Sequence, residues 1–150
     1  MIAYPDTSFL CPLYRSQDNS PVAAAHFRAM PDVLHVSSLL LYELRQSLRF
    51  HVWLLAQGSA KGFGEVECDK ALAAVQSDLD TGAVVIVPVE WPDVHQIAER
   101  LSSTYTKAAG HRAFDVLHVA TALHLGAREF LSFDDRQRKL AKAEGLKVKP

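Results

Sequence analysis

The sequence predicts an α/β fold, with a central, mostly parallel sheet of about five strands flanked by helices. Short apolar runs alternate along the chain with longer segments of helical periodicity, which is typical of such folds. The run AVVIVPV at 83–89 is almost continuously β-branched, as in a parallel strand that is covered on both faces. The 150 residues are enough for one hydrophobic core, so we expect a single domain over 1–150.

The expected elements follow one another with short connections. We expect strands over 1–4, 33–37, 83–89, 129–133 and 146–148. We expect helices over 20–30, 38–57, 65–79, 92–107, 113–125 and 135–144.

In the first half of the chain, Pro5 stops the first strand, and Ser20 with Pro21 suits the N-cap and first position of a helix. Leucines at helical spacing predict the long second helix, and Gly82 ends the third. The loop 58–64 joins two helices with no strand between them. We expect these helices to form an αα-hairpin that offers a surface to a partner.

In the second half, Pro88 places the third strand near an edge of the sheet or ends it there. Pro92 starts the next helix, and Gly126 and Gly145 follow the last two helices as C-terminal stops.

Composition and charge exclude several classes of protein. The net charge is −1, so no global field points to nucleic acid or membrane, and the basic stretch 136–149 is typical of a solvated helix face. Cys11 and Cys68 have no metal-ligand spacing and suit a core in a reducing compartment. No apolar stretch is long enough to span a membrane, and the first residues do not resemble a signal peptide. We therefore expect a cytoplasmic protein.

Four acids fall at one edge of the predicted sheet. Asp6 and Asp134 directly follow strands, while Glu43 and Asp115 lie near the starts of helices. The carboxyl ends of parallel strands share one edge, where ligands of open α/β sheets bind. We therefore expect the four carboxylates to approach one another there.

Each acid also has a structural explanation when it is taken alone. Asp6 could cap a turn, Glu43 could be a surface residue, and Asp115 could favour a helix dipole. Asp134 could be an N-cap that forms a capping box with Gln137.

Together, however, clustered carboxylates repel one another unless a cation is present. A set of oxygen ligands without cysteine or paired histidines suits Mg²⁺ or Mn²⁺, as one or two ions, rather than zinc. Asp135 follows Asp134 directly, and we favour Asp134 as the acid that faces the metal because it is nearer the strand end.

Four motifs carry a resemblance to a known family. They are Asp-Thr-Ser at 6–8, Leu-Tyr-Glu-Leu at 41–44, Arg-x-x-Asp-x-x-His-x-Ala-x-Ala at 112–122 and Phe-Leu-Ser-Phe-Asp at 130–134. In this order they resemble the PIN-domain nucleases and, more narrowly, the VapC toxins of toxin–antitoxin pairs. The similarity covers the whole chain and is most specific over 112–149.

The resemblance implies a three-layer PIN-like fold and a metal-dependent endoribonuclease that hydrolyses RNA phosphodiester bonds. Asp6, Glu43, Asp115 and Asp134 would be the catalytic residues and would hold Mg²⁺ or Mn²⁺. It also implies a homodimer and a cognate antitoxin whose C-terminal segment enters the acidic groove.

Several neighbours of these acids are candidates for substrate binding or support. The candidate RNA contacts are Ser8, Arg112, Arg136 and Arg138. Arg112 could equally pair with an acid, and Ser8 or Thr7 could instead support the metal ligands or cap the local turn.

Other residues have structural explanations. His118 lies one turn after Asp115 and is more typical of a packed structural histidine. Trp53 and Trp91 could stack on bases, but packing in the core or an interface is the more common role. The segment 51–70 matches nothing specific to the family.

Rival functions remain open. A phosphatase would need a second acid two residues after Asp6, and a receiver domain would need acids before it; both are absent. A PIN-like module that binds RNA or protein without cutting, and a PIN nuclease outside a toxin–antitoxin pair, are the alternatives that we retain.

Overall fold

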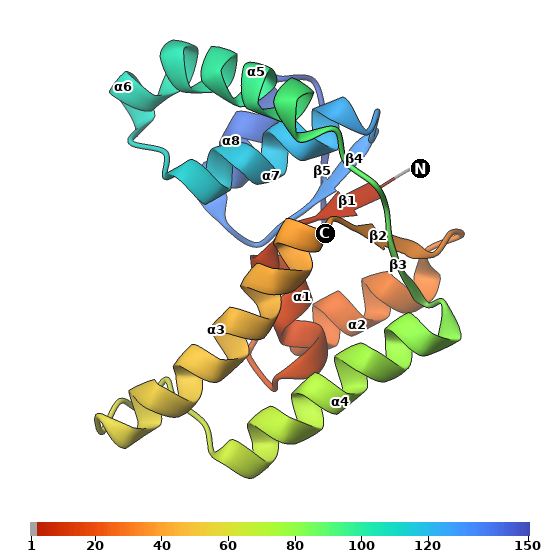
Figure 1. Cartoon of the computed structure of the whole chain (residues 1–150), viewed down its shortest axis with the longest axis vertical. Coiled ribbons are helices and arrows are strands. Elements are labelled where there is room, and N and C mark those ends of the chain that lie inside the picture. Colours follow the sequence, from red (N-terminus) through yellow and green to blue (C-terminus); the bar gives the residue numbers. More distant parts are fainter. Residues whose placement is uncertain (1–2) are drawn as a thin grey trace.

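The computed structural model describes residues 3–150, which place short strands between two layers of helices (Figure 1). The strands are β1 (Ala3–Pro5), β2 (Leu34–Val36), β3 (Val84–Ile86), β4 (Glu129–Leu131) and β5 (Lys147–Lys149). The helices are α1 (Thr7–Tyr14), α2 (Ser20–Ala29), α3 (Ser38–Ala56), α4 (Glu65–Thr81), α5 (Trp91–Leu101), α6 (Lys107–Ala109), α7 (Ala113–His124) and α8 (Asp135–Ala143), with a π-helical turn at Ser102–Thr106. None of the helices described is long and apolar enough to cross a membrane.

All strand pairs that form hydrogen-bonded ladders are parallel, which confirms the predicted fold class. The main ladder has the order β1-β4-β5, and β2 pairs with β3 in a second ladder. β2 lies beside β1, so the two ladders meet edge to edge (Figure 1). In the main ladder Pro5 is opposite Leu131, and the ends of β1 and β4 therefore reach the same edge together.

The two helical layers come from different parts of the chain. Helices α1 to α4 lie on one side of the strands, and α5, α7 and α8 lie on the other (Figure 1). The core between them is apolar, and Tyr4, Phe9 and Phe130 are among its largest fully buried side chains. Burial of this apolar area is the main stabilising term for such a fold.

The expected helical hairpin is present as α3 and α4, which pack against each other. Its connection is tight, because a Cβ at Gly62 would collide with the backbone of Leu55. At the other end of α4, Gly82 adopts a left-handed conformation with φ of 76°, as the sequence indicates for a helix stop.

Two elements differ from the sequence prediction. Helix α1 was not among the expected elements. Pro12 lies inside it, and proline disfavours helix interiors. Burial of Phe9, Leu10 and Cys11 in the core outweighs that cost. The helix expected over 92–107 is interrupted after α5 by the π-helical turn. The first strand is described from Ala3, and residues 1–2 of its prediction lie outside the described residues.

Candidate active site

Asp6 is a fully buried acid directly after β1, and it caps the N-terminus of α1. Its Oδ1 accepts hydrogen bonds from the Phe9 backbone N–H (3.0 Å) and the Ser8 hydroxyl (2.7 Å). Its Oδ2 accepts one from the Ser132 hydroxyl (2.6 Å). Burial raises the pKa of Asp6 to about 6, although all three hydrogen bonds favour the ionised form. A cation beside Asp6 would offset this cost of burying the charge.

The Ser8 hydroxyl ties the start of α1 to the loop that follows β4. Besides donating to Asp6, its oxygen accepts hydrogen bonds from the backbone N–H groups of Phe133 (2.8 Å) and Asp134 (3.1 Å). The hydroxyl is therefore engaged on both sides. In this arrangement Ser8 supports the acids, which is one of the two roles that the sequence suggests.

Glu43 extends from α3 toward α7 and is partly buried. Its Oε2 accepts hydrogen bonds from Nε2 of His118 (2.5 Å) and from the Thr7 hydroxyl. Desolvation alone would raise the pKa of Glu43, but the hydrogen bond and charge of His118, helped by Thr7, hold it below the ordinary value. Glu43 is therefore ionised and fixed in orientation at neutral pH.

Asp115 and Asp134 form the remaining part of the cluster. Asp115 lies in the first turn of α7, where burial raises its pKa and the negative charge of Asp134 raises it further. Asp134 caps α8, its Oδ1 accepting hydrogen bonds from the Arg136 and Gln137 backbone N–H groups, both 2.9 Å long. The capping box does not close, because Gln137 Oε1 has no hydrogen-bond partner in the described chain. Asp135 is exposed and has no such link to Asp115.

His118 connects the acids that the sequence places at this edge. It is 1% exposed and donates to Glu43. Burial raises the pKa values of Asp6 and Asp115, and the charge of His118 offsets a part of that rise. The packed histidine suggested by the sequence thus also positions a candidate ligand. Sequence reasoning missed this contact, although the spacing from Asp115 places His118 on the same face of α7.

Ser132 was also missed as a supporting residue. It is fully buried and contacts Asp6 across the edge of β1 and β4. The only signal for it in the sequence is its position directly before Phe133-Asp134.

The donor chemistry suits a hard divalent cation. The donors are carboxylate oxygens from four separate segments. Burial raises the pKa values of Asp6 and Asp115, and the charge of Asp134 adds to the rise at Asp115. Within residues 3–150, however, no three His, Cys, Asp or Glu side chains are yet close enough to enclose an ion. The ligand set therefore stays a prediction.

The three arginines predicted to contact substrate lie in different settings. Arg112 is exposed at the N-cap of α7, and Arg136 is exposed in the first turn of α8. Arg138 is partly buried, and its Nη1 donates to the carbonyl oxygens of Ser132 (2.6 Å) and Pro150 (3.1 Å). Arg112 and Arg136 are thus free to meet a phosphate, whereas Arg138 holds the end of β4 to the chain terminus.

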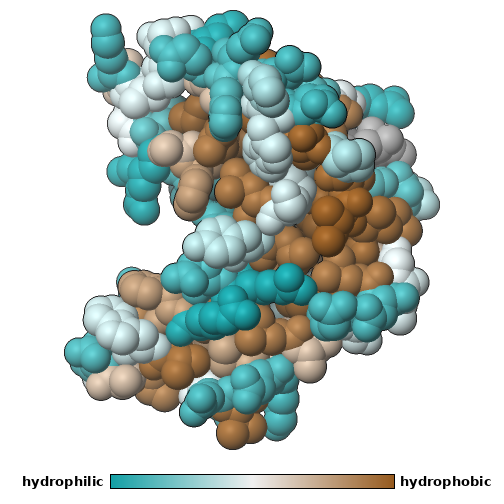
Figure 2. Space-filling model, viewed as in Figure 1, coloured by the Kyte–Doolittle hydropathy of each residue, from teal (hydrophilic) through white to brown (hydrophobic). Residues whose placement is uncertain are grey.

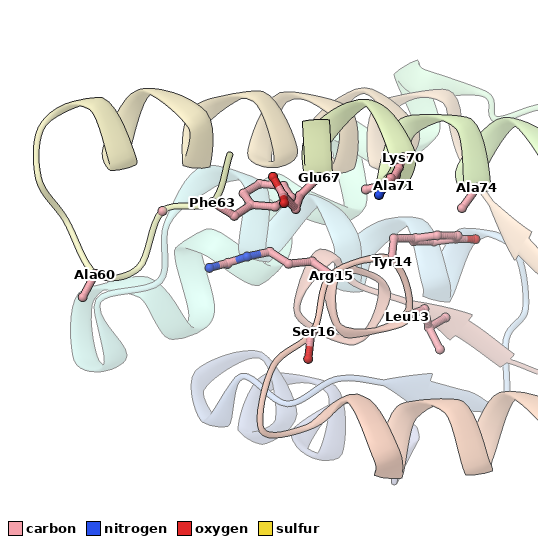
Figure 3. Close-up of a pocket in the computed structure, with 11 residues that line it drawn as sticks. Leu13, Tyr14, Arg15, Ser16, Ala60, Phe63, Glu67, Lys70, Ala71 and Ala74 are labelled. Atoms are coloured by element: carbon pink, nitrogen blue, oxygen red, sulfur yellow. The ribbon is translucent and has the colours of Figure 1, made fainter. Parts of the chain in front are cut away.

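Surface shape gives these residues a place to receive a ligand. Figure 2 shows a deep notch between the part of the molecule formed by α5 to α8 and the arm formed by α3. Glu43 lies on α3 and Asp115 lies in the first turn of α7, and these two helices border the notch. A separate cavity of about 560 Å³ lies between the end of α1, the loop before α4 and α4 itself (Figure 3), and it contains none of the four acids.

Comparisons with known proteins agree with this geometry. Residues 3–143 match the family model described as the PIN domain. The fold is similar to Mycobacterium tuberculosis VapC20, a toxin that cleaves the sarcin–ricin loop (TM-score 0.65, 18% identity, 99% of each chain covered). It is also similar to FitAcB from Neisseria gonorrhoeae (TM-score 0.61, 18% identity, 100% of this chain and 97% of that chain covered).

A third similar structure is PAE2754 from Pyrobaculum aerophilum, with a TM-score of 0.60, 17% identity, and coverage of 99% of this chain and 89% of that chain. No curated protein sequence matches significantly. The family model spans nearly the whole chain, and we conclude that the chain belongs to the PIN domain family.

Proposed function

We propose that this protein is a metal-dependent endoribonuclease and the toxin of a VapBC-type toxin–antitoxin pair. The observation that carries the proposal is the set of contacts that connects the four acids. Ser8 bonds both Asp6 and the Asp134 backbone, the charge of Asp134 acts on Asp115, and His118 bonds Glu43. Membership in the PIN domain family and the fold shared with VapC20 support the same function.

Asp6, Glu43, Asp115 and Asp134 would hold Mg²⁺ or Mn²⁺ at this edge. When bound, such an ion lowers the pKa of a coordinated water and stabilises negative charge on the leaving oxygen. Ser8 and Ser132 keep Asp6 in place by hydrogen bonds to its two oxygens. His118 and Thr7 do the same for Glu43, which is placed to hold a ligand or orient the attacking water.

Exposed cations at the rim of the site would bind the RNA backbone. Arg112 is the N-cap of α7, which carries Asp115. Arg136 is the second residue of α8, which directly follows Asp134. Their charges would attract phosphates that the acids alone would repel. RNA in the cytoplasm is the substrate class that we propose.

A homodimer and an antitoxin are the proposed protein partners. Phe50 and Trp53 stack on each other with their ring centroids 5.3 Å apart and are about half exposed, so α3 presents an apolar surface. An apolar surface of this kind suits a protein partner. Analytical ultracentrifugation of the wild type and of Trp53→Ser would test whether the dimer uses this surface.

The nuclease is tested with labelled RNA and purified protein in the presence of Mn²⁺, Mg²⁺ or EDTA. We expect cleavage by the wild type only with metal, and none by Asp6→Asn or Asp115→Asn. Asp69→Asn, which changes an exposed acid on α4, is the matched control and should cut normally. Equal cleavage by all four proteins would indicate a contaminating nuclease, and metal-independent RNA binding without cutting would favour a binding module.

The toxin role needs a separate test. A small neighbouring open reading frame, expressed together with this chain, should bind the protein and suppress cleavage. If no neighbouring product binds, the nuclease acts outside a toxin–antitoxin pair.

A further inference from the structure

A polar hollow of about 380 Å³ adjoins the candidate active site on the side of α1 and α3. Thr7, Ser8 and Asp134 line it and also belong to the acid site. Because Ser8 donates to Asp6, a single hydrogen bond separates the wall of the hollow from the buried carboxylate. A group bound in the hollow would therefore lie beside a phosphate held at the acid site.

One wall of the hollow carries side-chain amides that are free to bind a ligand. Asn19 occupies the N-cap of α2, where asparagine commonly caps, but its side chain makes no capping hydrogen bond. The hydrogen bonds at this turn are made by the Ser20 hydroxyl, which accepts from the Gln17 backbone N–H and donates to the Arg15 carbonyl oxygen. Both Gln17 and Asn19 line the hollow, and neither side-chain amide is hydrogen-bonded to any of residues 3–150.

The wall formed by α3 presents one imidazole nitrogen and one hydroxyl to the hollow. Nδ1 of His51 lies 2.7 Å from the Ser47 carbonyl oxygen, which can only accept, so Nδ1 carries the proton. Nε2 is then the ring nitrogen left to contact a ligand. The Ser47 hydroxyl oxygen accepts a weak hydrogen bond from the Cys11 thiol (3.6 Å), which leaves its own proton available.

The remaining surfaces suit a flat ring better than an anion. Phe133 lines the hollow and stacks on Phe9 with ring centroids 6.0 Å apart, which gives an apolar face. Arg15 also reaches the hollow, but its guanidinium extends toward the loop before α4 (Figure 3). There it lies 5.1 Å from the Phe63 ring centroid and donates to the Lys61 carbonyl. Neutral donors and acceptors beside an aromatic face are what recognises the edge of a nucleobase.

From these groups we propose that the hollow binds the base of the nucleotide next to the scissile phosphate and sets the sequence preference of cleavage. The inference rests on the proposed nuclease function. The volume lies within the usual range for small-ligand pockets, about 300–1,000 Å³. The residues that would contact the edge of the base are Gln17, Asn19, Ser47 and His51.

The test compares the wild type with the double variant Gln17→Ala/Asn19→Ala and with Gln96→Ala, a matched control on the exposed face of α5. Each protein cleaves a pool of randomised RNA with Mn²⁺, and the new ends are sequenced. We expect the wild type to favour one base at one position beside the cut. The double variant should lower that preference at least tenfold, and the control should leave it unchanged. Thermal melting checks that each variant is folded.

The outcomes separate this inference from the nuclease proposal. A wild type that cuts without a base preference beside the cut, or a double variant with an unchanged preference, overturns the base site and leaves the nuclease standing. If the wild type cuts no RNA, the nuclease proposal fails. A nucleotide-binding measurement then tests whether the hollow binds a base. In that case the four nucleoside 5′-monophosphates are titrated into ¹⁵N-labelled protein. Shifts at Ser47 and His51 for one base, weakened in the double variant, support the site, whereas equal or absent shifts overturn it.

Discussion

Replacing Asp6 by asparagine should stabilise the metal-free protein at neutral pH while abolishing its proposed activity. The folded chain buries this carboxyl completely and raises its pKa to about 6, whereas its ordinary value is 3.8. A carboxyl with a raised pKa in the folded state binds more protons there than in the unfolded state. The free energy of unfolding therefore falls as the pH rises from about 4 to about 6, and the full cost persists above that range.

The size of the effect follows from the same two values. Their separation corresponds to about 3 kcal/mol of lost stability at pH 7.5 and roughly 0.5 kcal/mol at pH 4. An asparagine side chain has no charge to bury, and its oxygen and NH₂ group can still bond the Phe9 N–H and the Ser132 hydroxyl. Some bond strength is lost, about 1 kcal/mol, because charged acceptors bind more strongly than neutral ones. We expect a net gain of about 2 kcal/mol at pH 7.5.

Urea denaturation followed by circular dichroism in EDTA measures this difference at pH 4 and pH 7.5. Asp69→Asn is the control, and its difference from the wild type should not change with pH. Adding Mn²⁺ should stabilise the wild type more than Asp6→Asn, because an ionised Asp6 is the proposed ligand. A stability difference between Asp6→Asn and the wild type that is the same at both pH values would refute the reasoning.

Three further changes test other contacts. His118→Leu removes the donor to Glu43 and should lower the rate of Mn²⁺-dependent RNA cleavage tenfold or more. His118→Gln keeps a donor and should retain most of that rate. Cleavage kinetics measure both variants, and equal rates would contradict the positioning role. Arg138→Ala removes two hydrogen bonds to backbone carbonyls and should cost about 1–2 kcal/mol in urea denaturation, and an unchanged midpoint would mean that these bonds add nothing. Gly62→Ala forces a collision with backbone and should cost about 1–3 kcal/mol, whereas Gly64→Ala meets only a flexible carboxylate and should be nearly neutral by the same assay.

Local patterns predicted most of the architecture. The alternation of strands and helices, and the glycine stops such as Gly82, depend on neighbouring residues and can be read from the chain. Helix α1 could not be predicted in this way, because Pro12 argues against a helix locally. The helix forms because burial of its apolar side chains against distant elements outweighs the cost of an internal proline.

The candidate site was predicted in outline for a similar reason. Parallel strands bring their carboxyl ends to one edge, so the positions of the four acids follow from topology. The side chains that hold them do not follow from topology. Ser132 contacts Asp6 across 126 positions in the sequence and His118 contacts Glu43 across 75, and no local pattern records either pair.

The long sequence separation of these two contacts has a consequence for how the protein is made. A ribosome adds about 5–20 residues per second, so Ser132 is synthesised several seconds after Asp6. During that interval the emerging polypeptide lacks the assembled carboxylate edge. On the proposed nuclease function, it would therefore not cut the RNA of the ribosome that is producing it. The proposed activity would therefore begin only once translation is nearly finished, which leaves time for the proposed antitoxin to be present at the moment of completion.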